Sequence, residues 1–249
     1  MFFMFFNNMF INATKHYMEV SMDNNVDDNI DIDGHVNIDI DKHVDNKYVP
    51  EIVDFHVDWH LIKEACMATV GKKAGKEPTS EWKKKLMIAG HSPIRRSLIS
   101  WKWDEIPSYV STHFCRHHVS VEKYCKTSRS DRTGVPRSER RQTDAISMEM
   151  DANIQSLINI AERRLCTQAD SETRKYMEGL VDAISERDED IAFMMVPNCV
   201  KLGGCPEAFG SCKFFENFAK NLTKEELIDI NARYNAYNEY RKKIKSLKK

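Results

Sequence analysis

A run of basic side chains in the middle of the chain is the part of the sequence best suited to chemistry. The segment FCRHHVSVEKYCKTSRSDR places Arg116, His117 and His118 in a row and adds Arg129 and Arg132 a few residues later. Arginine binds phosphate through two parallel hydrogen bonds, and histidine can donate or accept a proton near pH 7. These residue types fit an anionic, phosphorylated ligand, although a basic edge facing solvent would have the same composition.

Metal sites are less consistent with the spacing of the candidate ligands. His117 and His118 are adjacent, so in a helix their side chains point about 100° apart, and no acid or cysteine stands in register with them. Cys199, Cys205 and Cys212 are six and seven residues apart, whereas paired cysteines in common zinc modules usually lie about two to four residues apart. We therefore interpret the three cysteines as structural or incidental thiols and predict no metal.

A second candidate lies in the segment NIQSLINIAERR, which runs from Asn153 to Arg164. The two end residues are eleven positions apart, or about three helical turns, so on a helix both emerge on nearly the same face roughly 16 Å apart. Gln155 and Asn159 lie between them. A polar set of this kind can bind a ligand along one helix, but an ordinary amphipathic surface helix has the same pattern.

Several enzyme classes have no support in the sequence. We find no glycine-rich phosphate loop, no Gly-x-Ser-x-Gly segment and no cysteine protease pattern. A Ser-His-Asp hydrolase is therefore not indicated.

Length and charge indicate one folded domain after an acidic extension. The chain has 249 residues, a mass of 29.0 kDa and a formal net charge of −1. Residues 1–50 carry nine acidic residues against three lysines, which leaves residues 51–249 mildly basic. We interpret residues 1–50 as a low-complexity extension, in preference to an edge hairpin formed by NIDIDGHVNIDID, and expect order to begin near Val53. The mild basic balance suits small phosphorylated molecules and is too weak for a stable nucleic-acid complex.

The cysteine count and the hydropathy indicate a cytoplasmic protein. Seven cysteines are scattered along the chain without a secretory leader, so we expect reduced thiols. No segment approaches the roughly 20 apolar residues that a membrane helix needs. We expect no membrane association.

Local patterns predict an α+β fold in which helices pack on a modest antiparallel or mixed sheet. Strands are expected at residues 97–106 and 119–128, and a loop is expected at residues 132–144. Residues 194–212 have no regular pattern. Helices are expected at residues 60–70, at 79–90 with Thr79 or Ser80 as the cap and Gly90 as the stop, at 107–118, at 151–165, from about Ser171, and at 220–249.

Taken together, these segments resemble the flavin-dependent thymidylate synthases, which methylate dUMP with electrons carried by a reduced flavin. The resemblance runs from about Val53 to about Cys212. GHSP at residues 90–93 is similar to the Gly-His-x-Ser-Pro segment of the family, and SLISWKWDEIPSYVSTHFCRHH is similar to its strand, helix and Arg-His-Arg box. RHHVSVEKYCKTSR and NIQSLINIAERRLCTQADSETR resemble the long motif and the flavin helix that follow.

The resemblance implies two sets of site residues. The implied FAD contacts are Ser92, Arg116, His117, His118, Asn153, Gln155 and Asn159. The implied dUMP contacts are His113, Arg116, Thr127, Ser128, Arg129, Arg137 and Arg164. Arg164 would also polarise the uracil ring, which makes it the implied catalytic residue.

The resemblance further implies FAD as cofactor, 5,10-methylenetetrahydrofolate and NADPH as co-substrates, and a homotetramer with sites shared between subunits. The sequence departs from the family motif at His118 and Gln155, where arginine is usual, and at Val121 and Lys123, where serine and asparagine are usual. Because the long motif contains one extra residue here, either Arg129 or Arg132 could be its last arginine. The further nucleotide-binding arginine that the resemblance implies could be Arg137, Arg140 or Arg141. Modification of another pyrimidine nucleotide, or nucleotide or nucleic-acid binding without catalysis, are the competing functions.

Overall fold

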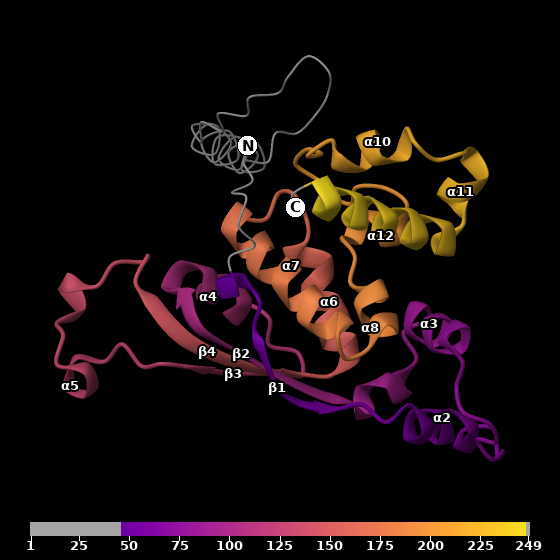
Figure 1. The fold of residues 1–249 in the computed structure, drawn as a ribbon, viewed down its shortest axis with the longest axis horizontal. Coiled ribbons are helices and arrows are strands. Elements are labelled where there is room, and N and C mark those ends of the chain that lie inside the picture. The colour runs from indigo at the N-terminus through magenta and orange to yellow at the C-terminus, as the bar shows by residue number, and fades with distance from the viewer. Residues whose placement is uncertain (1–45, 248–249) are drawn as a thin grey trace, which may run out of the picture. The chain divides into compact units, whose positions relative to one another are not determined.

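A four-stranded antiparallel sheet organises the computed structural model, which describes residues 46–247 (Figure 1). The strand order is β1-β2-β4-β3, and every neighbouring pair is antiparallel. The predicted strands are confirmed as β2 and β3, whereas β1 and the central strand β4 were not predicted. The bounds are β1 Glu51–His56, β2 Leu98–Pro107, β3 Val121–Cys125 and β4 Ala145–Ala152.

One face of the sheet forms the core. Successive side chains of a strand point to opposite faces, and Trp101 and Trp103 of β2 are buried together with Met148 and Met150 of β4. Lys102, between the two tryptophans, pairs in register with Glu149 on the other, polar face. This alternation explains why helices cover only one side of the sheet.

Three helices lie on the apolar face, and the first two carry His113, Gln155, Asn159 and Arg164: α4 (Ser108–Cys115), α6 (Ile154–Arg164) and α7 (Ser171–Ser185) (Figure 1). Trp103 of the sheet contacts Phe114 of α4 and Tyr176 of α7, with ring centroids 5.1 and 5.8 Å apart. Each of the latter two helices begins at a side-chain cap, because Asn153 accepts a hydrogen bond from Ser156 N and Asp170 accepts one from Thr173 N. The predicted helices are confirmed here, and the fold class is α+β.

The folded part begins earlier than Val53. A 3-10 turn, η1 (Asn46–Tyr48), precedes β1, and Tyr48 O accepts a hydrogen bond from the Trp103 indole at 3.1 Å. A Cβ atom at Gly179 of α7 would lie 2.1 Å from the same carbonyl oxygen, so only glycine fits there. Tyr48 is thus part of the core packing, and the alternatives for the acidic extension before residue 46 lie outside the described residues.

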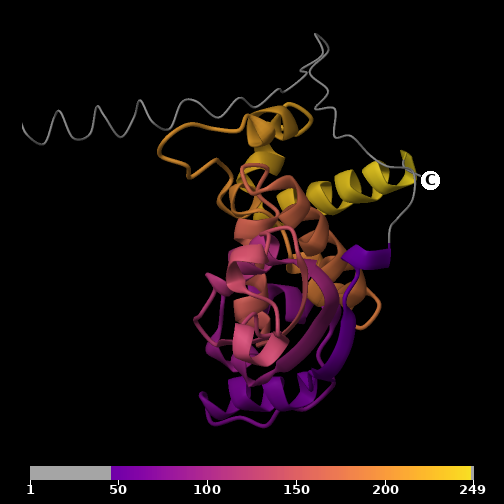
Figure 2. The same cartoon turned by 90° about the vertical axis from the view of Figure 1, so that its left-hand side faces the viewer.

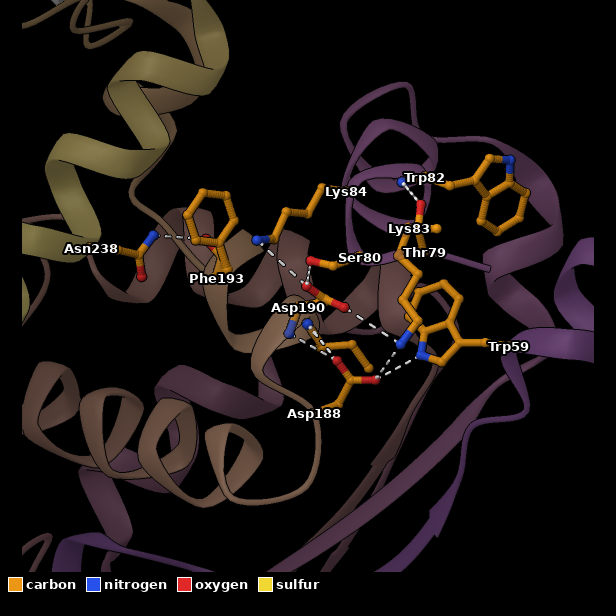
Figure 3. Close-up of polar contacts among 11 residues, drawn as sticks. Trp59, Thr79, Ser80, Trp82, Lys83, Lys84, Asp188, Asp190, Phe193 and Asn238 are labelled. Atoms are coloured by element: carbon orange, nitrogen blue, oxygen red, sulfur yellow. Dashed lines mark hydrogen bonds and ion pairs between the residues drawn. The ribbon is translucent and has the colours of Figure 1, made fainter. Parts of the chain in front are cut away.

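A partly buried polar network joins helices at the β1 end of the sheet (Figure 3). Asp188 caps α8 (Glu189–Met194) by accepting from Asp190 N and Ile191 N, and it also accepts from the Trp59 indole at 2.7 Å. Lys83 lies 3.4 Å from the Asp190 carboxylate. These contacts tie α2 (Trp59–Ala68) and α3 (Ser80–Ile88) to α8, and Thr79 caps α3 as predicted.

The C-terminal helices lie on the side of α6 and α7 that is remote from the sheet, as Figure 1 and Figure 2 show. The single helix predicted at residues 220–249 is wrong, because Asp229 has an extended backbone that separates two helices. The segment predicted as irregular contains one short helix. The bounds are α9 Asn198–Leu202, α10 Phe214–Ala219, α11 Lys224–Ile228 and α12 Ile230–Leu247.

The predicted loop before β4 holds two short helical turns, α5 (Ser130–Thr133) and η3 (Arg137–Glu139). Across residues 46–247, no helix combines the length and apolar character required to cross a bilayer.

Candidate active site

Arg164 connects two of the predicted motifs. It is the last residue of α6, and its Nε donates to His117 Nε2 at 2.9 Å while its Nη2 donates to the carbonyl oxygen of His113 at 2.5 Å. His117 lies just beyond the end of α4. The fold therefore brings together a cation and two histidines that are separated by about fifty positions in the chain.

The contact with Arg164 fixes the ionisation state of His117. A guanidinium has only donors, so His117 Nε2 must accept, and the neutral ring then carries its proton on Nδ1. Burial and the nearby charge of Arg164 lower the pKa of His117 from 6.5 to about 4. At neutral pH the pair thus consists of a charged arginine and an uncharged histidine that can still donate from Nδ1.

His113 is held by a second, partly buried chain of hydrogen bonds. Its Nδ1 lies 2.8 Å from the Thr173 hydroxyl, which donates to the Asp170 carboxylate at 3.0 Å. Because that hydroxyl has only one hydrogen, His113 must donate from Nδ1 and leave Nε2 as an acceptor. Burial, and then the charges of Arg164 and Arg116, lower the pKa of His113.

The sequence interpretation missed the roles of Thr173 and Asp170. Thr173 is fully buried, and Asp170 serves both as the cap of α7 and as the acceptor for the threonine hydroxyl. An aspartate three residues before a threonine at the start of a predicted helix is a recognisable capping pattern. That pattern could have identified the pair, although not its contact with His113.

Positive charge surrounds Arg164. Burial, Arg116 and Arg163 lower the pKa of its guanidinium, which shows that the arginines act on one another. Lys123 contributes a further cation by donating to the carbonyl oxygen of His117 at 2.6 Å. His118 is exposed, with its Nδ1 3.1 Å from the carbonyl oxygen of Arg116. A cluster of positive charges attracts an anion, because a bound anion reduces the electrostatic repulsion between the cations.

Four of the predicted flavin contacts, Ser92, Asn153, Gln155 and Asn159, lie along or beside the first half of α6, whereas Arg116, His117 and His118 lie at the Arg164 end. Gln155 donates to Asn159 at 3.0 Å, and a Cβ atom at Gly90 would lie 3.4 Å from Gln155 Oε1. Ser92 begins η2 (Ser92–Arg96), a short turn that contacts α6. Asn153 uses its side-chain oxygen to cap the helix. The structure thus brings the GHSP segment to the amides of Gln155 and Asn159, away from Arg164.

Four other predicted residues are not brought to Arg164 within one chain. Thr127, Ser128, Arg129 and Arg137 lie in the exposed segment between β3 and β4, and Figure 1 shows α5 far from α6. The Arg129 guanidinium is instead paired with the Asp131 carboxylate through two hydrogen bonds of 3.0 and 2.8 Å.

The structure distinguishes the candidates within one of the two sets of alternative arginines and not within the other. Arg129 and Arg132 both face Asp131, the second at 3.9 Å, so neither is distinguished. Of Arg137, Arg140 and Arg141, Arg140 has a buried Nε without a hydrogen-bond partner among the described residues. A buried unpaired donor is costly, which favours Arg140 as the one that meets a ligand.

Comparisons with known proteins give distant similarity to solved structures. No protein-family model matches the chain, and no curated protein matches it. A crystal structure of the UMP/dUMP methylase PolB from Streptomyces cacaoi, bound with 5-Br dUMP, is similar at a TM-score of 0.47 and 13% sequence identity, over 59% of this chain and 93% of that one.

Proposed function

We propose that the chain is an FAD-dependent thymidylate synthase that converts dUMP to dTMP with 5,10-methylenetetrahydrofolate and NADPH. The observation that carries this proposal is the contact of Arg164 with His117 and His113. The sequence resemblance, which uses no spatial information, assigns His117 to the flavin and His113 and Arg164 to the nucleotide of one site. Their convergence from two separate motifs supports that assignment.

The proposed co-substrates satisfy the electron balance of the reaction. The methylene group of the folate is at the oxidation level of formaldehyde, and its conversion to the methyl group of dTMP takes up two electrons. NADPH supplies those electrons as a hydride, so the products are dTMP, tetrahydrofolate and NADP⁺. FAD, when bound, would carry the electrons between NADPH and the one-carbon unit.

In this proposal Arg164 would stabilise charge on the base. Two of its five N–H groups are used in the hydrogen bonds to His117 and His113, which leaves three for a ligand. Uracil C5 becomes nucleophilic as charge is pushed onto the ring, and a fixed cation near a carbonyl oxygen stabilises that charge as it develops. The two histidines hold the guanidinium in place, so little reorganisation is needed during the reaction.

The second residue set suits FAD. Gln155 and Asn159 offer amide donors and acceptors for the edge of a flavin ring, and the absence of a side chain at Gly90 leaves space beside Gln155. Arg116 and His118 are exposed and offer donors for a pyrophosphate. These residues would bind and orient the cofactor.

A homotetramer is part of the proposal. Asn153 and Gln155 lie at the start of α6 and Arg164 at its end, and at eleven residues this helix is roughly 16 Å long. We propose that the two ends of the helix serve different parts of clefts shared between subunits, so that each site takes one set from each of two chains.

Two measurements test the function. Expression in a thymidine-requiring bacterium is expected to permit growth without thymidine, and the purified chain is expected to be yellow with a flavin absorbance band. A colourless protein that does not take up added FAD and does not restore growth would contradict the proposal. A flavoprotein that fails to restore growth would reject dUMP as the substrate and retain the flavin site.

A further inference from the structure

Four thiols surround one cavity next to the end of α6. Cys166 follows that helix, Cys199 lies in α9, and Cys205 and Cys212 lie in the loop between α9 and α10. All four line a cavity of about 310 Å³, and all four are free thiols. The described part of the chain thus concentrates four of its seven cysteines in one place, although they come from three segments of the sequence.

The surrounding contacts hold the segments that carry these thiols. Arg233 of α12 is buried and donates to the carbonyl oxygens of Val200 and Lys201 at 2.7 and 2.8 Å, which fixes the end of α9. Gln168 donates to the carbonyl oxygen of Gly210 at 2.7 Å, and the Thr167 hydroxyl donates to the Cys212 sulfur. The loop is therefore attached to the turn that carries Cys166.

We propose that Cys166, Cys199, Cys205 and Cys212 bind a thiophilic divalent cation, of which Zn²⁺ is the best match. Four sulfur donors favour tetrahedral zinc over cations that prefer oxygen. Within residues 46–247, no group of three His, Cys, Asp or Glu side chains is already placed to hold a metal. The thiols must therefore move inward to close around the ion, and the loop between α9 and α10 supplies two of them.

The charges at the cavity complement such a centre. Zn²⁺ with four thiolates carries a formal charge of −2, and binding releases four protons from the four thiols. Arg163 and Arg164 line the same cavity and offset that charge. Glu162 also lines the cavity, but Lys201 pairs with its carboxylate at 2.6 Å. Four uncharged thiols without a metal would place no negative charge beside the two arginines.

Backbone amides contact the Cys166 sulfur at the edge of the cavity. Burial raises the pKa of the Cys166 thiol, and the backbone amides of Gln168 and Ala169 oppose this by donating to its sulfur. The thiols of Cys205 and Cys212 also raise the pKa of Cys166, and all three side chains line the same cavity. Amides that donate to sulfur stabilise the negative form that a metal requires.

The sequence interpretation predicted no metal because it compared only Cys199, Cys205 and Cys212 with known spacings. The fourth thiol, Cys166, is contributed by the turn after α6, and only the fold places it beside the other three. The proposed site would fasten the loop between α9 and α10 to the end of the helix that carries Arg164. It does not depend on the proposed synthase activity.

Metal analysis of the full chain, purified with a reductant and without chelator, tests the site. We expect about one Zn²⁺ per chain, and replacement by Co²⁺ is expected to give the thiolate charge-transfer and intense visible bands of tetrahedral cobalt. Cys205→Ser and Cys212→Ser should each lower the metal content at least about tenfold. Cys66→Ser, in α2 and outside the cluster, is the matched control and should keep the metal.

The cobalt titration requires no mutation, so it remains decisive if a variant fails to fold. Zinc-free chain that binds no cobalt under reducing conditions would overturn the proposal. Disulfide-linked peptides among the four cysteines in the chain as purified, together with no metal uptake after reduction, would show a disulfide cluster instead. Equal loss of metal in Cys66→Ser would also overturn it, because the ion would then not be held at this cavity.

Discussion

Arg164 Nε donates to His117 Nε2 at 2.9 Å, and this contact joins the end of α6 to the segment that follows α4. The hydrogen bond requires His117 to be neutral, so the positive charge of the pair resides on the arginine. A protonated His117 would place a second cation against Arg164 and lose its acceptor. The hydrogen bond therefore requires a charged Arg164 and a neutral His117.

Arg164→Ala should slow dTMP formation by on the order of 10², or about 3 kcal/mol, because it removes a donor whose interaction strengthens as charge develops on the base. FAD occupancy should persist, since the predicted flavin amides lie at the other end of α6. Turnover and flavin absorbance of the same preparation measure the two effects. Arg187→Ala removes an exposed arginine after α7 and serves as the control; an unchanged rate in Arg164→Ala would contradict the assigned role.

The stability of the chain should depend on pH through His117. Its pKa is lowered from 6.5 to about 4 in the folded chain, so between these pH values the unfolded chain binds the proton and the folded chain does not. The stabilisation from the neutral ring is complete above about pH 6.5 and is lost as the pH falls towards 4. Urea unfolding at several pH values measures this loss.

His117→Gln keeps a hydrogen-bond acceptor but does not titrate, so its free energy of unfolding should fall less steeply with decreasing pH than that of the wild type. The difference between the two curves isolates His117 from the carboxylates, which titrate in the same range. His118→Gln changes the exposed neighbour and should run parallel to the wild type. Parallel curves for all three chains would show that His117 is not buried against Arg164.

Much of this site could be predicted from the sequence. The motif containing Arg116, His117 and His118 and the helix ending at Arg164 were both located correctly, because charge and helical period are local properties. What the sequence could not supply was the pairing between them, since that depends on how α4 and α6 pack on the sheet. Neither could it show that Asn153 caps α6, so Asn153→Ala costs about 1 kcal/mol of helix stability in addition to any effect on FAD.

The missed strand β4 has a physical explanation. AISMEMDA alternates buried and less buried residues, with Met148, Met150 and Ala152 in the core, but methionine and alanine have little strand preference by themselves. The strand forms because β2 and β3 pair with its two edges.

The break at Asp229 was missed because the segment is polar and helix-forming on both sides. Arg233 donates to the carbonyl oxygens of Leu227 and Ile228 only in the folded chain.

Thr173→Val should release His113 from its fixed tautomer. Valine has the shape of threonine but cannot bridge His113 and Asp170, so both lose a buried partner, at a cost of about 1–3 kcal/mol in the free energy of unfolding. Imidazole ¹⁵N shifts should change from a single Nδ1–H form to a mixture. Thr173→Ser retains the hydroxyl and should preserve the wild-type spectrum; a mixture in the wild type as well would contradict the hydrogen-bond chain.

Asp188→Ala should destabilise the fold by about 3 kcal/mol, because it removes the cap of α8 and leaves the Trp59 indole N–H without its acceptor (Figure 3). Asp188→Asn can still accept both kinds of hydrogen bond and should lose much less. Glu189→Ala, at the exposed next position, is the control for the change in charge. The midpoints of urea unfolding compare the three, and equal midpoints for Asp188→Ala and Glu189→Ala would rule out the network as a source of stability.

Sharing of the site between subunits should be visible as complementation. Gln155→Ala weakens the flavin set and Arg164→Ala the nucleotide set, so each variant alone should be nearly inactive. If each site takes its two sets from different chains, random mixing in co-expressed tetramers gives about one quarter of the sites two intact sets, and activity should return to that fraction of wild type. Light scattering should give a mass about four times the 29.0 kDa of one chain. If the mixed tetramers stayed inactive, both sets would have to come from one chain, and the roughly 16 Å along α6 would have to be spanned by a different binding mode.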